Sequence, residues 1–424
     1  MFKTTYSSLY YLLVNIIWFF AFFDGIRSNM LHSEYITLVK AIVTFGTFFF
    51  VLLYYKKGLK LNWGIKLFYI DVLIVFLVSL CDAIQLNIYY GIRFYAQYFL
   101  FILFVYLYQP LVHSEKFNIN QILTSVTKIS VLYVLMNWFF FFIELPIWTR
   151  FHPWWGRISQ GYPTLEVFPL SISLAILLLY EKLLYSRNLR LLYILIVTAG
   201  LLGMVSGTGF VSLGLISITV FMVLSYKKKP SIIIKQTFIS LAIIGILIFS
   251  GITAIRHYSP ALYENIIYVG NNRLSILLGG GEDVEFNTFD IRKKQYEAAQ
   301  KKYIKDEIDY LVGIGTAKVT CDALLVNEKN IFIEDQYSLN FITMGVLGNV
   351  LMAIFLLSLI IHTLKRNDIT MKTKAMYLLF VLLFGVCCKN SCPFNSFAAL
   401  AVFSLCYVLI MGDLSLPGKT DSSK

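Results

Sequence analysis

Long apolar segments fill almost the whole chain and constrain its fold more than any other feature of the sequence. One long polar stretch interrupts them, from His257 to Tyr337. A membrane span needs about 20 largely apolar residues, and windows of this kind lie near 8–23, 36–54, 67–81, 94–109, 123–143, 164–184, 191–206, 209–225, 237–255, 338–362, 376–389 and 396–412. We therefore expect an all-α polytopic membrane protein with about 12 transmembrane helices and one large loop.

The composition agrees with this class. Hydrophobic residues make up 58% of the chain and charged residues 14%, and the mean hydropathy is +0.72, which a soluble core would not absorb. The net charge of +12 arises largely from lysines in short loops between apolar segments. Membrane topology and anionic lipid account for that charge, so we do not expect nucleic acid as a partner.

The lysine-rich loops alternate along the chain, which predicts its topology. Basic residues cluster in every second connection: Lys56, Lys57, Lys60, Lys66, Arg187, Arg190, Lys227, Lys228, Lys229, Lys235, Lys365, Arg366, Lys372 and Lys374. The positive-inside rule assigns these connections and both termini to the cytoplasm of a bacterial cytoplasmic membrane, and the large loop to the outer side. The expected organisation is a bundle over 1–256, an extracytoplasmic loop over 257–337, further spans over 338–412 and a cytoplasmic tail over 413–424.

Arginine follows the opposite distribution to lysine. Seven of the ten arginines fall at or near the expected outer face: Arg27, Arg93, Arg150, Arg157, Arg256, Arg273 and Arg292. A guanidinium binds phosphate oxygens through a planar fork of donors and stays charged, which suits a pyrophosphate ligand. The plainer alternative is that these side chains pair with acids of the loop or with lipid headgroups.

Two outer segments carry further signals. The loop from Glu144 to Pro163 contains adjacent Trp154 and Trp155, which indicate either a platform for stacking a sugar or an interfacial aromatic belt. In the large loop, the segment 290–303 is rich in helix formers. We expect a surface helix there that begins with Asp290 as its cap and places Ile291, Tyr296 and Ala299 or Ala298 on one face.

The sharpest local signal is a pair of glycine motifs on either side of a polar pair. The stretch LVGIGTAKV (311–319) precedes IEDQYSLNFITMGVLG (333–348). Together they resemble the C-terminal part of bacterial O-antigen and capsular polysaccharide polymerases of the Wzy type and the related O-antigen ligases. In that superfamily a GxG follows the loop helix, and a polar pair such as His-Asn precedes a helix with GxxG. The matching residues here are the pair Asp335 and Gln336 and the glycines Gly345 and Gly348.

A second segment is similar to the same superfamily. GMVSGTGFVSL (203–213) resembles the SGSRG or TGSR turn between two of its spans, but it lacks the arginine, which puts a phosphate contact at that turn in doubt. The resemblance covers roughly residues 190–362. Glycines at such positions also have a plain explanation, because small residues allow close packing of helices in membranes.

The resemblance implies a fold similar to the C-type glycosyltransferases and transfer of a glycan from undecaprenyl pyrophosphate to a lipid-linked repeat unit. It implies no cofactor and no metal, and the outer carboxylates form no metal-type pattern with histidines. Membrane lipid, a flippase and a chain-length regulator are the other implied partners. A carboxylate or histidine would take the proton of the acceptor hydroxyl, and the arginines would stabilise the leaving pyrophosphate.

We assign the base to Asp335 or its neighbour Glu334, with His257 as a further candidate. The predicted substrate-binding residues are Arg273, Arg292, Arg157, Arg150, Arg93, Trp154, Trp155 and Gln336. A role for Asp335 solely as a helix cap is an open alternative, because aspartate is common at that position.

Three other functions remain open. A lipid-linked oligosaccharide flippase would be expected to show internal repeats and short loops on both faces, whereas this chain has one asymmetric loop. An O-antigen ligase differs mainly in its acceptor, and the absence of the superfamily's histidine before the tenth span favours a polymerase. A membrane scaffold or sensor would leave the outer arginines and the tryptophan pair unexplained.

Overall fold

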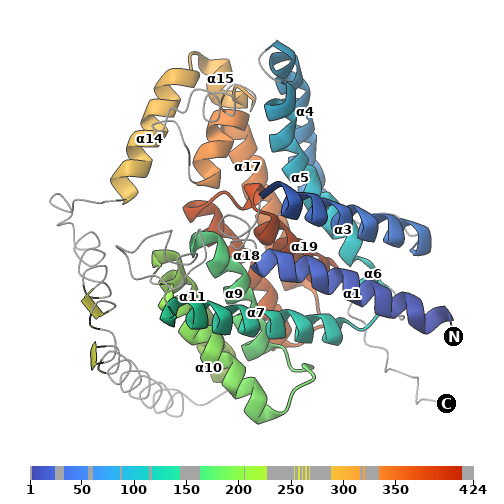
Figure 1. The fold of residues 1–424 in the computed structure, drawn as a ribbon. Helices are drawn as coiled ribbons and strands as arrows, with labels where there is room; N and C mark the ends of the chain where they lie inside the picture. Colours follow the sequence, from blue (N-terminus) through green and yellow to red (C-terminus); the bar gives the residue numbers. More distant parts are fainter. Residues whose placement is uncertain are drawn as a thin grey trace.

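A computed structural model of the chain is shown in Figure 1. It describes residues 2–23, 33–55, 61–85, 88–113, 117–143, 163–204, 206–226, 288–315, 319, 333 and 335–412, and single residues between 253 and 267. The regular secondary structure of this part is helical, as predicted.

A helix lies at every expected span except 237–255, of which the structure describes residue 253 alone. The helices are α1 (Phe2–Phe22), α3 (Ser33–Tyr54), α4 (Trp63–Gln85), α5 (Ile88–Tyr108), α6 (Pro110–His113), α7 (Ile119–Phe142), α9 (Pro163–Leu179), α10 (Arg187–Gly203), α11 (Gly207–Ser225), α14 (Thr288–Tyr303), α15 (Glu307–Val312), α17 (Gln336–Lys365), α18 (Met371–Asn390), η3 (Pro393–Asn395) and α19 (Phe397–Met411). Within the described part, five are long and apolar enough to cross a membrane: α4, α7, α11, α17 and α18. The finer expectation of about 12 crossings stays a prediction.

Short polar residues set several helix starts. Ser186, Thr370 and Ser396 each have extended backbone, and each side chain accepts a hydrogen bond from the backbone N–H three residues on. These bonds satisfy donors that the first turn of a helix leaves unpaired. The starts of α10, α18 and α19 are therefore fixed locally, by the sequence itself.

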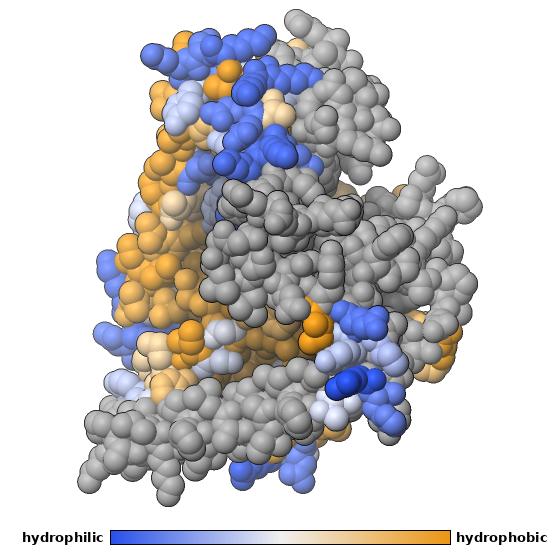
Figure 2. All heavy atoms as spheres, turned by 90° about the vertical axis from the view of Figure 1, so that its left-hand side faces the viewer, coloured by the Kyte–Doolittle hydropathy of each residue, from blue (hydrophilic) through white to orange (hydrophobic). Residues whose placement is uncertain are grey.

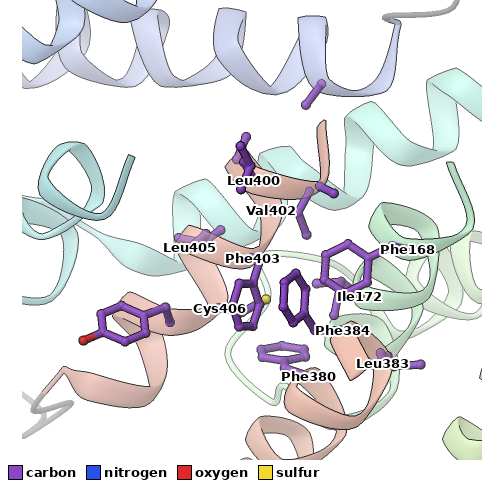
Figure 3. Packing of buried hydrophobic residues seen from close by; sticks show 14 of the residues in the cluster. Phe168, Ile172, Phe380, Leu383, Phe384, Leu400, Val402, Phe403, Leu405 and Cys406 are labelled. Carbon is purple, nitrogen blue, oxygen red and sulfur yellow. The ribbon is translucent and has the colours of Figure 1, made fainter. Parts of the chain in front are cut away.

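The centre of the bundle is packed with aromatic rings. Figure 3 shows Phe384 of α18 lying flat against Phe403 of α19, with ring centroids 3.5 Å apart and an interplanar angle of 4°. Phe168 of α9 meets Phe384 edge-on at 5.7 Å. Helix α19 is buried along almost its whole length, so it is the helix around which the others pack.

The outer surface is also apolar, which separates this bundle from a soluble one. Ile42, Leu53 and Ile84 are each more than 60% exposed, and the outward faces of α3, α4 and α11 carry many similar residues. Figure 2 shows apolar residues running down one side of the molecule, with hydrophilic residues gathered above them. Apolar patches of this extent are covered by lipid rather than by water. The protein is membrane-embedded.

Connections that the charge pattern assigns to one side do meet at one end of the bundle. The hydroxyl of Tyr106, near the end of α5, donates to the carbonyl of Tyr55, which follows α3 (3.3 Å). Lys372, at the start of α18, pairs with Glu181, which follows α9. We call this end the basic end. The opposite end, which carries α14 and α15, is the loop end (Figure 1).

The described part of the large loop is folded onto the bundle. Ala299 and Tyr303 of α14 are buried together with Leu339 and Ile342 of α17, and Ala299 rather than Ala298 is the buried member of the predicted pair. The predicted helix start is wrong by two residues: α14 begins at Thr288, so Asp290 lies inside the helix and does not cap it.

Candidate functional site

The two glycine motifs meet at a break in α17. Gly345 has φ of 65° and ψ of −165°, which no helical residue adopts, so the helix is interrupted there. Breaking a helix frees the carbonyls that residues 346 and 347 would otherwise pair with, those of Ile342 and Thr343. The Gly-Ile-Gly turn takes their place: Ile314 N donates to Ile342 O (3.1 Å) and Gly315 N to Thr343 O (3.0 Å).

Glycine is required on both sides of this junction. Gly313 and Gly345 have φ of 75° and 65°, a region that residues with a Cβ rarely adopt. A Cβ on Gly345 would also overlap the carbonyl oxygen of Leu311, and one on Gly313 would overlap the backbone of Met344. The two motifs therefore form one joint. The sequence resemblance gave only the order of these motifs along the chain, and the structure shows that they are in contact.

The part of α17 before the break folds back beside the part after it. We call residues 336–344 the short arm and residues 346–365 the long arm. Asn340 Nδ2 donates to Met352 Sδ (3.0 Å), and Asn349 Nδ2 donates to Tyr337 O (2.9 Å). Each pair is 12 residues apart, which in a continuous helix would rise roughly 18 Å. The helix predicted over 338–362 is therefore present, but it is interrupted at Gly345.

A buried polar network holds the short arm in place. Gln336 Nε2 donates to Tyr98 Oη (2.9 Å) and to Asn340 Oδ1 (2.8 Å), and Tyr98 Oη donates to the same Asn340 oxygen (3.1 Å). Phe394 N donates to Gln336 Oε1 (3.4 Å), and its ring stacks on that of Tyr98 with centroids 4.8 Å apart. All three polar side chains are at most 1% exposed. We call Tyr98, Gln336 and Asn340 the Tyr98 network.

Asp335 stands at the start of the short arm and is itself buried. Its backbone is extended, and its Oδ1 accepts a hydrogen bond from Ser338 N (2.9 Å), so it caps the helix. A carboxylate has further lone pairs beyond the one that a cap uses. Burial raises the pKa of Tyr296 in α14, and neighbouring Tyr310 and Asp335 raise it further. The Asp335 carboxyl therefore lies near the loop helices.

The loop helices cover the short arm. The ring of Phe341 lies between Tyr296 of α14 and Tyr310 of α15, at centroid distances of 5.8 and 5.1 Å. Helix α15 is capped by Asp306, whose side chain accepts from Asp309 N (2.8 Å), and it leads directly into the Gly-Ile-Gly turn. Loop helices, glycine joint and short arm form one packed unit at the loop end.

Of the predicted site residues, Asp335 and Gln336 belong to this unit. Arg292 lies in α14, one turn before Tyr296, and Arg93 lies in α5, five residues before Tyr98, so their backbone positions flank it. His257 is exposed. The remaining predictions fall outside the described residues: Glu334, Arg273, Arg157, Arg150, Trp154 and Trp155.

The network contains two residues that the sequence reasoning missed. Asn340 follows Gln336 by four residues inside an apolar segment, and that spacing puts both amides on one helix face, a signal available in the sequence. Tyr98 carried no such signal, because it is one of 28 tyrosines, many of which lie in apolar segments. Within the described ranges, no three histidine, cysteine, aspartate or glutamate side chains gather closely enough to hold a metal ion.

The other resembling segment lies apart, at the turn between α10 and α11. Ser206 precedes α11 without a side-chain cap bond, and a Cβ on Gly209 would lie 3.3 Å from Leu201 O. The glycine thus permits close packing of the two helices, which is the plain explanation of that motif.

Fold and site together define a helical membrane protein with a discontinuous helix beneath folded loop helices. Comparison of the chain with known protein families and with curated proteins finds no match.

Proposed function

We propose that this protein is a polysaccharide polymerase that joins undecaprenyl-pyrophosphate-linked repeat units at the outer face of a bacterial cytoplasmic membrane. One observation carries the proposal. The segments that resemble the Wzy-type superfamily, Gly313 to Gly315, Asp335 with Gln336, and Gly345, belong to a single packed unit. The contact between these segments is a structural reason for the motifs to occur together in this order.

The proposed reaction needs a base and a stabilised leaving group. The acceptor hydroxyl attacks the anomeric carbon of the donor glycan, the bond from that carbon to pyrophosphate breaks, and the hydroxyl proton passes to a carboxylate. Asp335 is the described carboxylate at the short arm, and it is the candidate base, with Glu334 and His257 as alternatives. A positioned base contributes about 100- to 10,000-fold to such a step.

The leaving pyrophosphate requires fixed positive charge in a site of low dielectric. Arg292 and Arg93 are the arginines whose helices flank the short arm, and Arg273, Arg157 and Arg150 complete the proposed set. Gln336 has a different role, because it is fully buried and both hydrogens of its amide nitrogen are donated inside the Tyr98 network. It positions the short arm and the Asp335 that begins it. Trp154 and Trp155 are proposed to stack on the glycan.

The proposal includes a location and partners. With the loop end outward, the donor and acceptor lipids reach the short arm from the outer leaflet, and the basic end faces the cytoplasm. A flippase that supplies the repeat units and a chain-length regulator are the proposed protein partners.

Deletion of the gene tests the proposal in the native cell. A polymerase deletion leaves single repeat units on lipid at the outer surface, and complementation with the wild-type gene restores long polymer. Polymer that is made but never attached to its final acceptor would indicate a ligase instead. Normal polymer in the deletion strain would refute the proposal.

A lipid-linked oligosaccharide flippase is the second candidate, and the break in α17 favours it. Discontinuous helices line the substrate sites of many transporters, and α17 has such a break at Gly345. The same deletion separates the two functions, because loss of a flippase leaves no repeat unit on the outer surface.

A further inference from the structure

One ionisable group lies deep in the bundle and takes no part in the proposed reaction. Asp71 is in α4, seven residues after Gly64 and eight before Ser79, which is roughly 10–12 Å from each along the helix axis. Gly64 packs against Ser358 near the basic end, and Ser79 packs against Gly315 at the loop end. Asp71 therefore lies midway along a helix that is long and apolar enough to span a membrane.

The Asp71 carboxyl is enclosed by the contact between α4 and α17. It is 5% exposed. A Cβ built on Gly348 of α17 would lie 3.4 Å from Asp71 Oδ2, so the carboxyl lies close against α17 at this residue. Gly348 is three residues beyond the break at Gly345, which places Asp71 beside the start of the long arm.

Asp71 Oδ2 has no hydrogen-bond partner among the described residues. Lys40 and Lys128 stand within other apolar segments and are the candidates for an ion pair with this carboxyl. Instead the Lys40 ammonium lies over the ring of Phe397, 5.0 Å from its centroid, and Lys128 lies over Tyr185 at 5.8 Å. The salt bridges found in the described part of the chain do not include Asp71.

Among the side chains that the structure describes on the helices packed against α4, none gives this carboxyl a charged partner. Their described titratable side chains are Asp335, Tyr337, His362 and Lys365 on α17 and Tyr98, Tyr106 and Tyr108 on α5, and α4 itself adds Lys66, Tyr69 and Cys81. Tyr98 is bonded within its network, Tyr69 to Tyr98 O, and Asp335 to Ser338. The residue that faces Asp71 from α17 is Gly348.

An isolated ionised carboxylate is far more costly in such surroundings than a neutral carboxyl, and the group takes up a proton instead. We propose that Asp71, beside the joint at Gly345, is a proton-binding site and that it holds its proton when α4 and α17 are packed as here. The ligand is a proton, and the site is independent of the polymerase assignment.

Labelling of the purified full-length protein with dicyclohexylcarbodiimide tests this directly. The reagent enters apolar regions and reacts with protonated carboxyls: the acid proton passes to a carbodiimide nitrogen, the carboxyl oxygen bonds to the central carbon, and rearrangement leaves a stable N-acylurea. We expect peptide mass spectrometry to find the adduct on Asp71, with labelling lost as pH rises. Asp368, which pairs with Arg366, is the internal control and is expected to stay unlabelled.

Infrared difference spectra between wild type and Asp71→Asn supply the second measurement, which does not depend on access of the reagent. The asparagine variant keeps the shape and neutrality of a protonated aspartate, so it is expected to fold. A carbonyl stretch of a carboxylic acid that disappears in the variant supports the proposal. A carboxylate band at neutral pH that disappears in the variant would overturn the proposal. So would the absence of both the adduct and the acid band in folded protein.

Discussion

At the scale of single residues, Asp335 has two roles that a substitution can separate. It caps the short arm by accepting from Ser338 N, and it is the proposed base. Asparagine and aspartate cap helices about equally well, whereas alanine loses about 1 kcal/mol. Only the carboxylate can accept the proton of a sugar hydroxyl at neutral pH.

We therefore predict that Asp335→Asn retains thermal stability but slows polymer formation by about 100- to 10,000-fold. Polymer length and rate would be measured in the deletion strain that expresses the variant, with membrane level and melting temperature as controls. Asp335→Ala is expected to lose stability as well. If the asparagine variant makes polymer of wild-type length at the wild-type rate, Asp335 is a helix cap and is not the base.

The Tyr98 network predicts an effect that no surface tyrosine would show. Tyr98→Phe removes a hydroxyl that accepts from Gln336 and donates to Asn340, and it leaves buried amide groups short of a partner. Such a loss costs about 1–3 kcal/mol. We expect a clearly lower melting temperature in detergent for this variant.

Tyr106→Phe is the matched control. Its hydroxyl makes one longer bond, 3.3 Å to Tyr55 O, at the edge of the bundle, so the change should be small. Equal melting temperatures for the two variants would show that the network adds no stability.

At the scale of elements, the joint between the Gly-Ile-Gly turn and α17 determines where the short arm lies. Gly345→Ala forces a side chain into a left-handed conformation, which costs about 1–3 kcal/mol, and the new methyl overlaps Leu311 O. We predict a marked loss of thermal stability, together with loss of activity because Asp335 moves.

Gly46→Ala in α3 serves as the control for this change. No atom lies within 4 Å of its built Cβ, and alanine favours a helix interior over glycine by about 0.5–1 kcal/mol. The control should melt at the wild-type temperature or slightly above. A Gly345→Ala variant that melts like the control would contradict the interruption of α17 at Gly345.

The ends of α17 and α19 are joined by a contact that depends on pH. Arg366 donates to the carboxylate of Asp368 and to the carbonyls of Ile410 and Gly412. The hydrogen bond from Arg366 lowers the pKa of Asp368 below its ordinary value. The resulting stabilisation is complete at neutral pH and is lost as pH falls below about 4 towards the lowered value.

Asp368→Asn should therefore melt lower than wild type at neutral pH, and the difference should vanish in acid. The Asp368 side chain is 45% exposed, so we expect the contribution to stay below about 1 kcal/mol. Melting curves of both proteins across this pH range provide the measurement. A difference that grows in acid would have the wrong sign for this pair.

At the scale of the whole molecule, the sequence predicted the helices better than their arrangement. Apolar segments of the right length mark helices because a lipid-facing backbone must bond internally. The break at Gly345 was not predicted, because a glycine within an apolar run is equally compatible with close helix packing. Only the contacts of Asn340 and Asn349 across the break reveal the turn.

The candidate site was predictable only where its residues are close together in the chain. Asp335 and Gln336 stand next to one another and next to the glycine motifs, so their proximity is encoded in chain order. Tyr98 reaches them from a helix more than 200 residues earlier, and such long-range pairing leaves no local pattern. The outer arginines show a compositional bias, but their grouping around a ligand depends on tertiary structure.

The measurement that tests the central claim most directly is reconstitution. Purified protein in liposomes would receive repeat units on undecaprenyl pyrophosphate, isolated from the deletion strain, and the products would be separated by length. The account predicts a ladder of longer lipid-linked glycans, without added metal or nucleotide sugar, and no ladder with Asp335→Asn. Unchanged single repeat units with folded wild-type protein would contradict it.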